Sequence, residues 1–239
     1  MARRLIILLI VSLSGFYSFG QESNPCVCDS LDPEITEPKL IGDLFVNQVT
    51  GTVSQYFIDE WLYGTVFLTN HLVVQNKLLK YNGFLDRVIW ITDNYQQVKL
   101  DKESVDGFCL NEKYTHKSYC FQKIRIREEL SSDSTLVYAQ LLYKGNLSLY
   151  AYRKVIHAGT TESQDRHYII DEFEKKDVYY FKFADNQTAG FKKINKKNIL
   201  KVFPGKKEEI INLFRSARQR QFKTQEDLIE VAALLNGMK

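Results

Sequence analysis

The chain has 239 residues, of which 44% are hydrophobic and 26% charged, and its formal net charge is +3. This composition is typical of a folded protein with enough length for one substantial core, and it excludes a disordered or low-complexity chain. The near-neutral total hides an uneven distribution of charge along the chain.

The first twenty residues have the pattern of a secretory signal peptide. Arg3 and Arg4 precede the apolar run 5–13, which is too short to span a bilayer, and small residues at positions 18 and 20 precede the expected cleavage after Gly20. A membrane anchor or a core helix is the alternative interpretation. Residues 21–39 are polar, include three prolines, and are expected to form an extended N-terminal lead-in.

Residues 40–194 are predicted to form an antiparallel β domain. From Trp61 onward, short β-branched and aromatic segments alternate with turn residues, and Asn82-Gly83 is a strong hairpin turn signal. Between 120 and 128, apolar and basic residues alternate as in a half-buried strand. Strands at such regular intervals favour an antiparallel meander that is barrel-like or folded into a sandwich.

The later part of this domain is expected to begin with a hairpin. Segments 136–143 and 147–155 are expected to pair around the turn 144–146. Residues 157–166 are expected as a polar loop, and the charged run 171–177 as a break between two further strands.

Cysteine usage agrees with export. Cys109 and Cys120 lie on two neighbouring apolar segments separated by a polar loop, which is the layout of a hairpin joined by a disulfide. Cys26 and Cys28 are spaced too closely for an unstrained bond to each other. A four-cysteine zinc site is a weaker alternative, because zinc knuckles space their cysteines by two or more residues.

Residues 195–239 are predicted to form a basic helical segment packed on the β domain as a helical hairpin. Two apolar stripes have helical spacing, at 210, 213, 214 and 217 and at 228, 231, 232 and 235. Residues 224–227 resemble a capping box with Asp227 in place of the usual glutamate. Arg215, Arg218 and Arg220 are candidates for basic residues that face a partner.

Charge makes this tail distinct from the body. From residue 191 onward there are 12 Lys and Arg and 5 Asp and Glu, whereas residues 21–190 are acidic overall. A basic arm suggests nucleic acid, but export argues against that partner. A membrane surface, an acidic partner or the protein's own acidic body remain as targets.

Motifs for catalysis are absent from the sequence: it has no nucleophile elbow, zinc-binding helix, phosphate loop or calcium loop. No cofactor and no metal is predicted. The densest titratable cluster surrounds His167, with Asp165 before it and Asp171, Glu172 and Glu174 beyond it. It can be a site for acid–base chemistry or, more simply, a charged loop beside a strand.

Tyrosines suggest another kind of site. Tyr150 and Tyr152 share one strand face, and Tyr138 lies in the strand expected to pair with it. An exposed face of this kind would bind a glycan or a partner strand. Ordinary sheet packing is the simpler interpretation, since aromatic residues commonly fill sheet faces.

Two stretches carry a resemblance to known proteins: residues 64–68, 79–82 and 86, and then 202–210, 222–223 and 227–229. They resemble a family of uncharacterised exported β-rich cell-envelope proteins of Bacteroidetes-type bacteria. The resemblance implies an envelope location. It implies no known catalysis and transfers no catalytic residue.

Together these observations predict a non-enzymatic binding or scaffold protein, periplasmic or associated with the outer membrane. It would be an accessory part of an envelope assembly, with a protein partner, possible contact with the membrane surface and no membrane-spanning segment after signal removal. A glycan- or lipid-binding β-barrel module is the alternative, and a hydrolase-type enzyme using His167 with its neighbouring carboxylates is the second alternative.

Overall fold

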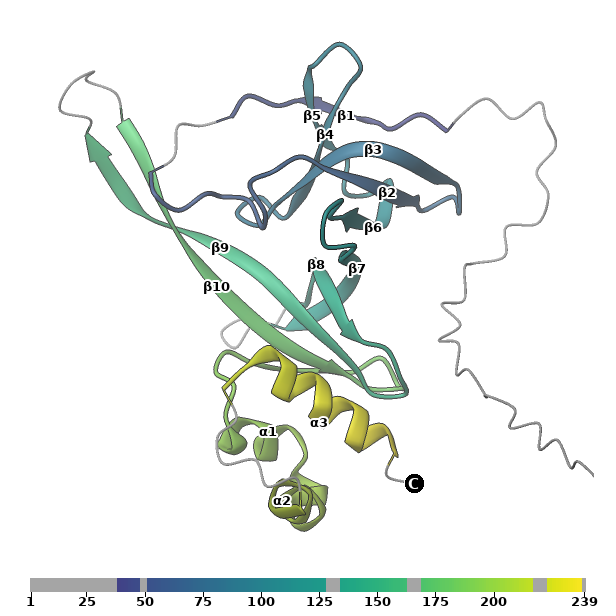
Figure 1. Cartoon of the computed structure of the whole chain (residues 1–239), viewed down its shortest axis with the longest axis vertical. Coiled ribbons are helices and arrows are strands. Elements are labelled where there is room, and N and C mark those ends of the chain that lie inside the picture. The colour runs from purple at the N-terminus through teal and green to yellow at the C-terminus, as the bar shows by residue number, and fades with distance from the viewer. Residues whose placement is uncertain (1–37, 48–50, 128–133, 163–168, 217–222, 238–239) are drawn as a thin grey trace, which may run out of the picture. The chain divides into compact units, whose positions relative to one another are not determined.

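The computed structural model describes residues 38–47, 51–127, 134–162, 169–216 and 223–237. The expected signal peptide lies outside them, as does nearly all of the expected lead-in. In Figure 1 the chain runs from the strands of the sheet to three short helices near its C-terminal end.

Eleven strands make up about half of the described chain. They are β1 (Gly42–Leu44), β2 (Leu62–Leu68), β3 (Val73–Asn82), β4 (Arg87–Ile91), β5 (Gln97–Leu100), β6 (Val105–Asn111), β7 (Ser118–Arg127), β8 (Ser134–Tyr143), β9 (Ser148–Glu162), β10 (Ile169–Lys182) and β11 (Thr188–Phe191). The helical segments are α1 (Lys196–Val202), the 3₁₀ turn η1 (Pro204–Lys206), α2 (Lys207–Ser216) and α3 (Gln225–Gly237).

All eleven strands belong to one antiparallel sheet in the order β1-β5-β4-β3-β2-β6-β7-β8-β9-β10-β11. Two meanders are joined where β2 pairs with both β3 and β6. The prediction of a mainly β protein with antiparallel strands and a C-terminal helical region is confirmed. The sheet is not closed over the described residues, since β1 and β11 stand at its two ends.

The first meander buries its core on one face. Leu79, Tyr81 and Val88 pack there with Phe108 and Phe121. The rings of Phe108 and Phe121 stack with centroids 4.8 Å apart, an arrangement that adds to the stabilisation from burial alone.

The second meander curls around its own core. Ile124 and Val137 pack there against Tyr150, Tyr152 and Tyr180. At the end of the sheet, Thr188 of β11 donates a hydrogen bond of 2.9 Å from Oγ1 to the carbonyl oxygen of Arg125 in β7. The curl therefore brings two strands into contact that are separated by three others in the sheet order.

Helices cover the opposite face of this second meander. Leu228, Val231, Ala232 and Leu235 of α3 are buried with β-strand residues such as Phe181. The stripe predicted at 228, 231, 232 and 235 thus packs on the sheet, because burying one apolar face is what stabilises a short helix. Ile210 of α2 joins the same core.

Side chains also tie α3 to the strands. Asn236 accepts a hydrogen bond of 3.0 Å from the main-chain N–H of Leu147 and donates one of 2.8 Å to the carbonyl oxygen of the same residue. Arg153 of β9 bonds to Gln140 of β8, to Asp177 of β10 and to Gln225 of α3. One guanidinium therefore fixes three strands and the helix in a single arrangement.

Two expectations about loops are wrong. β9 continues to Glu162 where a polar loop was expected after 157, and β10 runs without a break through the charged residues 171–177. Both strands extend beyond the part of β9 that pairs with β8. Their outer ends therefore have no β8 residues beside them, and polar side chains can stay exposed there. Polarity in this region reflects exposure and not the absence of a strand.

Candidate functional site

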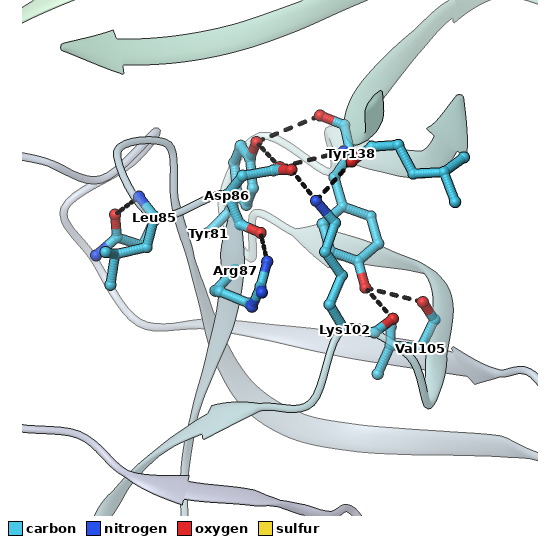
Figure 2. Close-up of polar contacts among 9 residues, drawn as sticks. Tyr81, Leu85, Asp86, Arg87, Lys102, Val105 and Tyr138 are labelled. Carbon is cyan, nitrogen blue, oxygen red and sulfur yellow. Dashed lines mark hydrogen bonds and ion pairs between the residues drawn. The ribbon is translucent and has the colours of Figure 1, made fainter. Parts of the chain in front are cut away.

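A largely buried polar cluster lies where the two meanders meet. Tyr81 from the end of β3, Asp86 from the turn before β4, Lys102 from the turn after β5 and Tyr138 from β8 converge there (Figure 2). Asp86 accepts from the hydroxyl of Tyr81 at 2.8 Å and from the main-chain N–H of Tyr138 at 3.1 Å. The ammonium group of Lys102 forms an ion pair with the same carboxylate.

Local sequence shapes the turn that carries Asp86. The Oδ1 atom of Asn82 accepts from the N–H groups of Phe84 at 3.1 Å and Leu85 at 3.0 Å, which closes the turn. Asp86 then takes a positive φ of 52°, a conformation that aspartate adopts more readily than most residues. The expected Asn82-Gly83 turn is therefore present, although β3 continues through Asn82.

This turn fits between two diverging strands. β8 pairs with β7 from Ser134 to Gln140, but with β9 only from Gln140 onward. On the β9 side, the N–H of Val155 donates to the carbonyl oxygen of Gly83 at 3.1 Å. A Cβ atom at Gly83 would lie 2.4 Å from the carbonyl oxygen of Arg153, so only glycine permits this approach.

On the β8 side, side chains take the place of a neighbouring strand. Asp86 accepts from the N–H of Tyr138, Tyr81 donates to the carbonyl oxygen of Tyr138 at 3.3 Å, and Lys102 donates to the carbonyl oxygen of Leu136 at 2.7 Å. Buried main-chain groups need such partners. The cluster thus completes the hydrogen bonding of this buried part of β8, where β9 does not pair with it.

Burial sets the protonation state of the tyrosines. It raises the pKa of the Tyr81 hydroxyl well above its usual value, and the adjacent Asp86 charge raises this pKa further. Burial, followed by the charge of Asp86, also raises the pKa of the Tyr138 hydroxyl, which donates to the carbonyl oxygen of Val105 at 2.8 Å. Both hydroxyls therefore stay protonated and act as hydrogen-bond donors.

Lys80 is a partly buried cation whose pKa is shifted from its usual value. Its ammonium lies 4.8 Å from the ring centroid of Tyr56, 5.1 Å from that of Trp61 and 3.8 Å from the carboxylate of Asp59. Burial lowers the pKa of Lys80, while the charge of Asp59 acts in the opposite direction. The aromatic rings and the carboxylate hold the ammonium as a structural cation.

A surface cavity of about 350 Å³ lies beside the end strand β1. It is lined by Ile41, Gly42, Asp43, Arg87, Lys99, Leu100 and Asp101. Arg87 connects it to the buried cluster, since its guanidinium donates to the main-chain oxygen of Asp86 at 3.0 Å. In its lining, Lys99 of β5 lies 3.9 Å from its cross-strand partner Asp43 of β1, so charges of both signs meet there.

The predicted disulfide is confirmed. Cys109 and Cys120 are directly opposite each other on β6 and β7 and are bonded. Cys26 and Cys28 lie outside the described residues. No group of three or more potential metal-ligating side chains gathers within the part of the chain that the structure describes.

The proposed tyrosine face is wrong. Tyr138, Tyr150 and Tyr152 are all buried, and Tyr138 belongs to a different core from the other two. The register explains the separation: Gln140 pairs with Ala151 and Leu141 with Tyr150, so Tyr138 faces away from Tyr150 and Tyr152.

The remaining candidates are only partly covered by the described residues. Arg215 lies in α2, with its side chain outside the description, and Arg218 and Arg220 lie outside it entirely. His167 and Asp165 also lie outside. Among the carboxylates expected near His167, Asp171 contacts His157, whose Nε2 lies 3.1 Å from Oδ1.

Sequence reasoning did not single out Lys102 and Arg87, and it noted Asp86 only through the resemblance. The one local signal was the turn at Asn82-Gly83. Comparisons with protein-family models, curated proteins and solved structures found no match for this chain. Within the described residues, no helix has the length and apolar character needed to cross a membrane.

Proposed function

We propose that this protein is a non-catalytic binding or scaffold protein of the bacterial cell envelope. It is exported through a cleaved signal peptide and is periplasmic or associated with the outer membrane. There it forms part of a protein assembly, with its β sheet as the rigid platform and its exposed edges as the contact surface.

The observation that supports this proposal most is the use made of the buried polar side chains. Asp86, Lys102 and Tyr81 are directed at main-chain atoms of β8. Catalytic groups need a face open to substrate and a poised protonation state. These side chains instead serve to hold two meanders together, as expected of a platform.

The disulfide between Cys109 and Cys120 adds weaker support for export, because such bonds persist in oxidising compartments. The signal-peptide pattern at residues 1–20 points in the same direction.

The test is made in the bacterium that carries the gene, with a C-terminal affinity tag on the full chain. We expect an envelope fraction containing a chain that begins at Gln21, and, after mild cross-linking of intact cells, one larger species of defined stoichiometry. A chain retained in the cytoplasm with residues 1–20 intact would overturn the envelope location. A purely monomeric envelope protein after cross-linking would overturn the scaffold role.

A further inference from the structure

We infer that β1 binds an extended polypeptide segment of a partner by strand addition, and that this segment carries apolar residues followed by a basic residue. The inference rests on the proposed binding function and names the class of partner. It is carried by the hydrogen-bonding geometry of β1, by its exposed apolar side chains and by the charge of Asp43.

The hydrogen-bonding direction of β1 follows from its register with β5. Asp101 donates from its N–H to the carbonyl oxygen of Ile41, and Phe45 donates to the carbonyl oxygen of Gln97, at 2.9 and 2.8 Å. In an antiparallel pair such bonds involve every second residue. The main-chain groups of Gly42 and Leu44 therefore point away from β5, toward the open edge.

That edge is not covered by any other described element. β1 stands at one end of the sheet order, with β5 as its neighbour in the sheet. Ile41, Leu44 and Val46 are 65%, 71% and 85% exposed. Proteins usually protect an open edge with charged or proline residues at such positions, and an unprotected apolar edge is a template for another strand.

Gly42 is needed for the close packing of β1 against β5. A Cβ atom there would lie 2.2 Å from the carbonyl oxygen of Lys99. Gly42 thus lets β1 lie close to β5, and the neighbouring cavity leaves room beside Asp43 for an incoming side chain.

Charge selects the occupant. The side chain of Asp43 is 85% exposed and lies 3.9 Å from Lys99 at its nearest charged contact. A second copy of this chain, paired so that β1 overlaps β1 completely, would place Asp43 opposite Asp43. Like charges in directly opposite positions destabilise a strand pair, whereas a lysine or arginine there is favourable. A basic partner segment is therefore preferred over self-association.

In an antiparallel alignment the partner places apolar side chains opposite Val46 and Leu44, two residues apart. The next residue then lies opposite Asp43 and is basic. The recognised pattern is apolar, any residue, apolar, basic, in an extended conformation.

The test uses the full mature chain, residues 21–239, and a synthetic peptide, Ac-Thr-Val-Thr-Val-Lys-Thr-NH₂. We expect saturable binding by fluorescence anisotropy, with slower amide hydrogen exchange at Gly42 and Leu44. A single N-methyl group at a peptide position facing β1 should abolish binding, and the same group on the next residue should not. If neither N-methyl group changed the affinity of the peptide, strand addition would be overturned.

Variants test the charge and the edge separately. Replacing the peptide lysine by norleucine should weaken binding about three- to fivefold, as expected for an exposed ion pair, and this difference should vanish in Asp43→Asn. Leu44→Pro removes an outward N–H without removing a bond to β5, and it should abolish binding at unchanged melting temperature. Asp185→Asn, in the exposed turn before β11 at the other end of the sheet order, is the matched charge control.

Two outcomes would overturn the inference while leaving the proposed function in place. One is a cross-linked envelope complex in a protein that shows no peptide binding and no protection at Gly42 or Leu44. The other is concentration-dependent dimerisation in sedimentation velocity that protects the same two amides, which would assign the edge to a second copy.

Discussion

The carboxylate of Asp86 accepts a hydrogen bond of 3.1 Å from the main-chain N–H of Tyr138, a residue that lies 52 positions further along the chain. The N–H belongs to the part of β8 that has no strand on its β9 side, because β8 and β9 pair only from Gln140 onward. A side chain thus takes the place of a strand at the junction of the two meanders.

Asp86→Asn should destabilise the fold by about 3 kcal/mol, because it leaves the largely buried ammonium of Lys102 without its counter-charge. Urea unfolding followed by circular dichroism measures the change. The double variant Asp86→Asn/Lys102→Met should lose less than the sum of the two single variants. Strict additivity would show that the pair is not coupled, and Asp93→Asn in an exposed turn serves as the control.

Asn236→Asp should loosen α3 from the sheet. The substitution keeps an acceptor for the N–H of Leu147 but places a carboxylate oxygen against the carbonyl of Leu147, which now accepts from Nδ2 at 2.8 Å. We expect a loss of about 2 kcal/mol in the free energy of unfolding. Asn212→Asp, exposed on α2, should change it little, and equal effects in both variants would contradict the role of Asn236.

Reduction of Cys109–Cys120 should lower stability by about 3 kcal/mol, as the chain-entropy model gives for a loop of this size. Thermal unfolding with and without dithiothreitol measures the shift in a Cys26→Ser/Cys28→Ser background. The variant that also lacks Cys109 and Cys120 should be insensitive to the reductant. An equal response in that variant would assign the effect to something other than this bond.

The carboxylate of Asp227 stabilises the N-terminus of α3, and this stabilisation depends on pH. Hydrogen bonds from the N–H groups of Lys223 and Thr224 to its carboxylate lower the pKa of Asp227 from its ordinary 3.8. A lowered folded-state pKa means that this stabilisation is complete above pH 3.8 and is lost as the pH falls through the folded pKa. NMR titration should place the midpoint below that of Asp227 in an unfolded peptide, and a midpoint at or above it would contradict the cap.

Gln97→Leu should stabilise the protein. The side-chain oxygen Oε1 of Gln97 is buried and has no hydrogen-bond partner among the described residues. Removing an unsatisfied buried acceptor should raise the free energy of unfolding by about 1 kcal/mol. The exposed neighbour variant Gln96→Leu is the comparison, and a loss of stability in Gln97→Leu would show that Oε1 has a donor after all.

Short-range patterns predicted several elements correctly. The capping box is present, since Asp227 donates from its N–H to the hydroxyl of Thr224 and accepts from the N–H of Thr224 in return. Asn195 caps α1, and this helix ends at Val202, shortly before Pro204. The pairing of Cys109 with Cys120 followed because both lie in one hairpin.

Longer-range features were not predicted. Nothing near Tyr138 in the sequence indicates that it faces away from Tyr150 and Tyr152, because that depends on the register between β8 and β9. Likewise, no local signal indicates that β2 pairs with β6, or that β1 is left at the end of the sheet.

The sequence by itself determined the alternating strands, the helical end, the capping box and the disulfide, because each depends on residues within about a dozen positions of one another. Only the tertiary structure decided the open edge at β1 and the junction at Asp86. Both depend on which strands lie side by side, and that choice is made by burial of the whole core and not by any one stretch of chain.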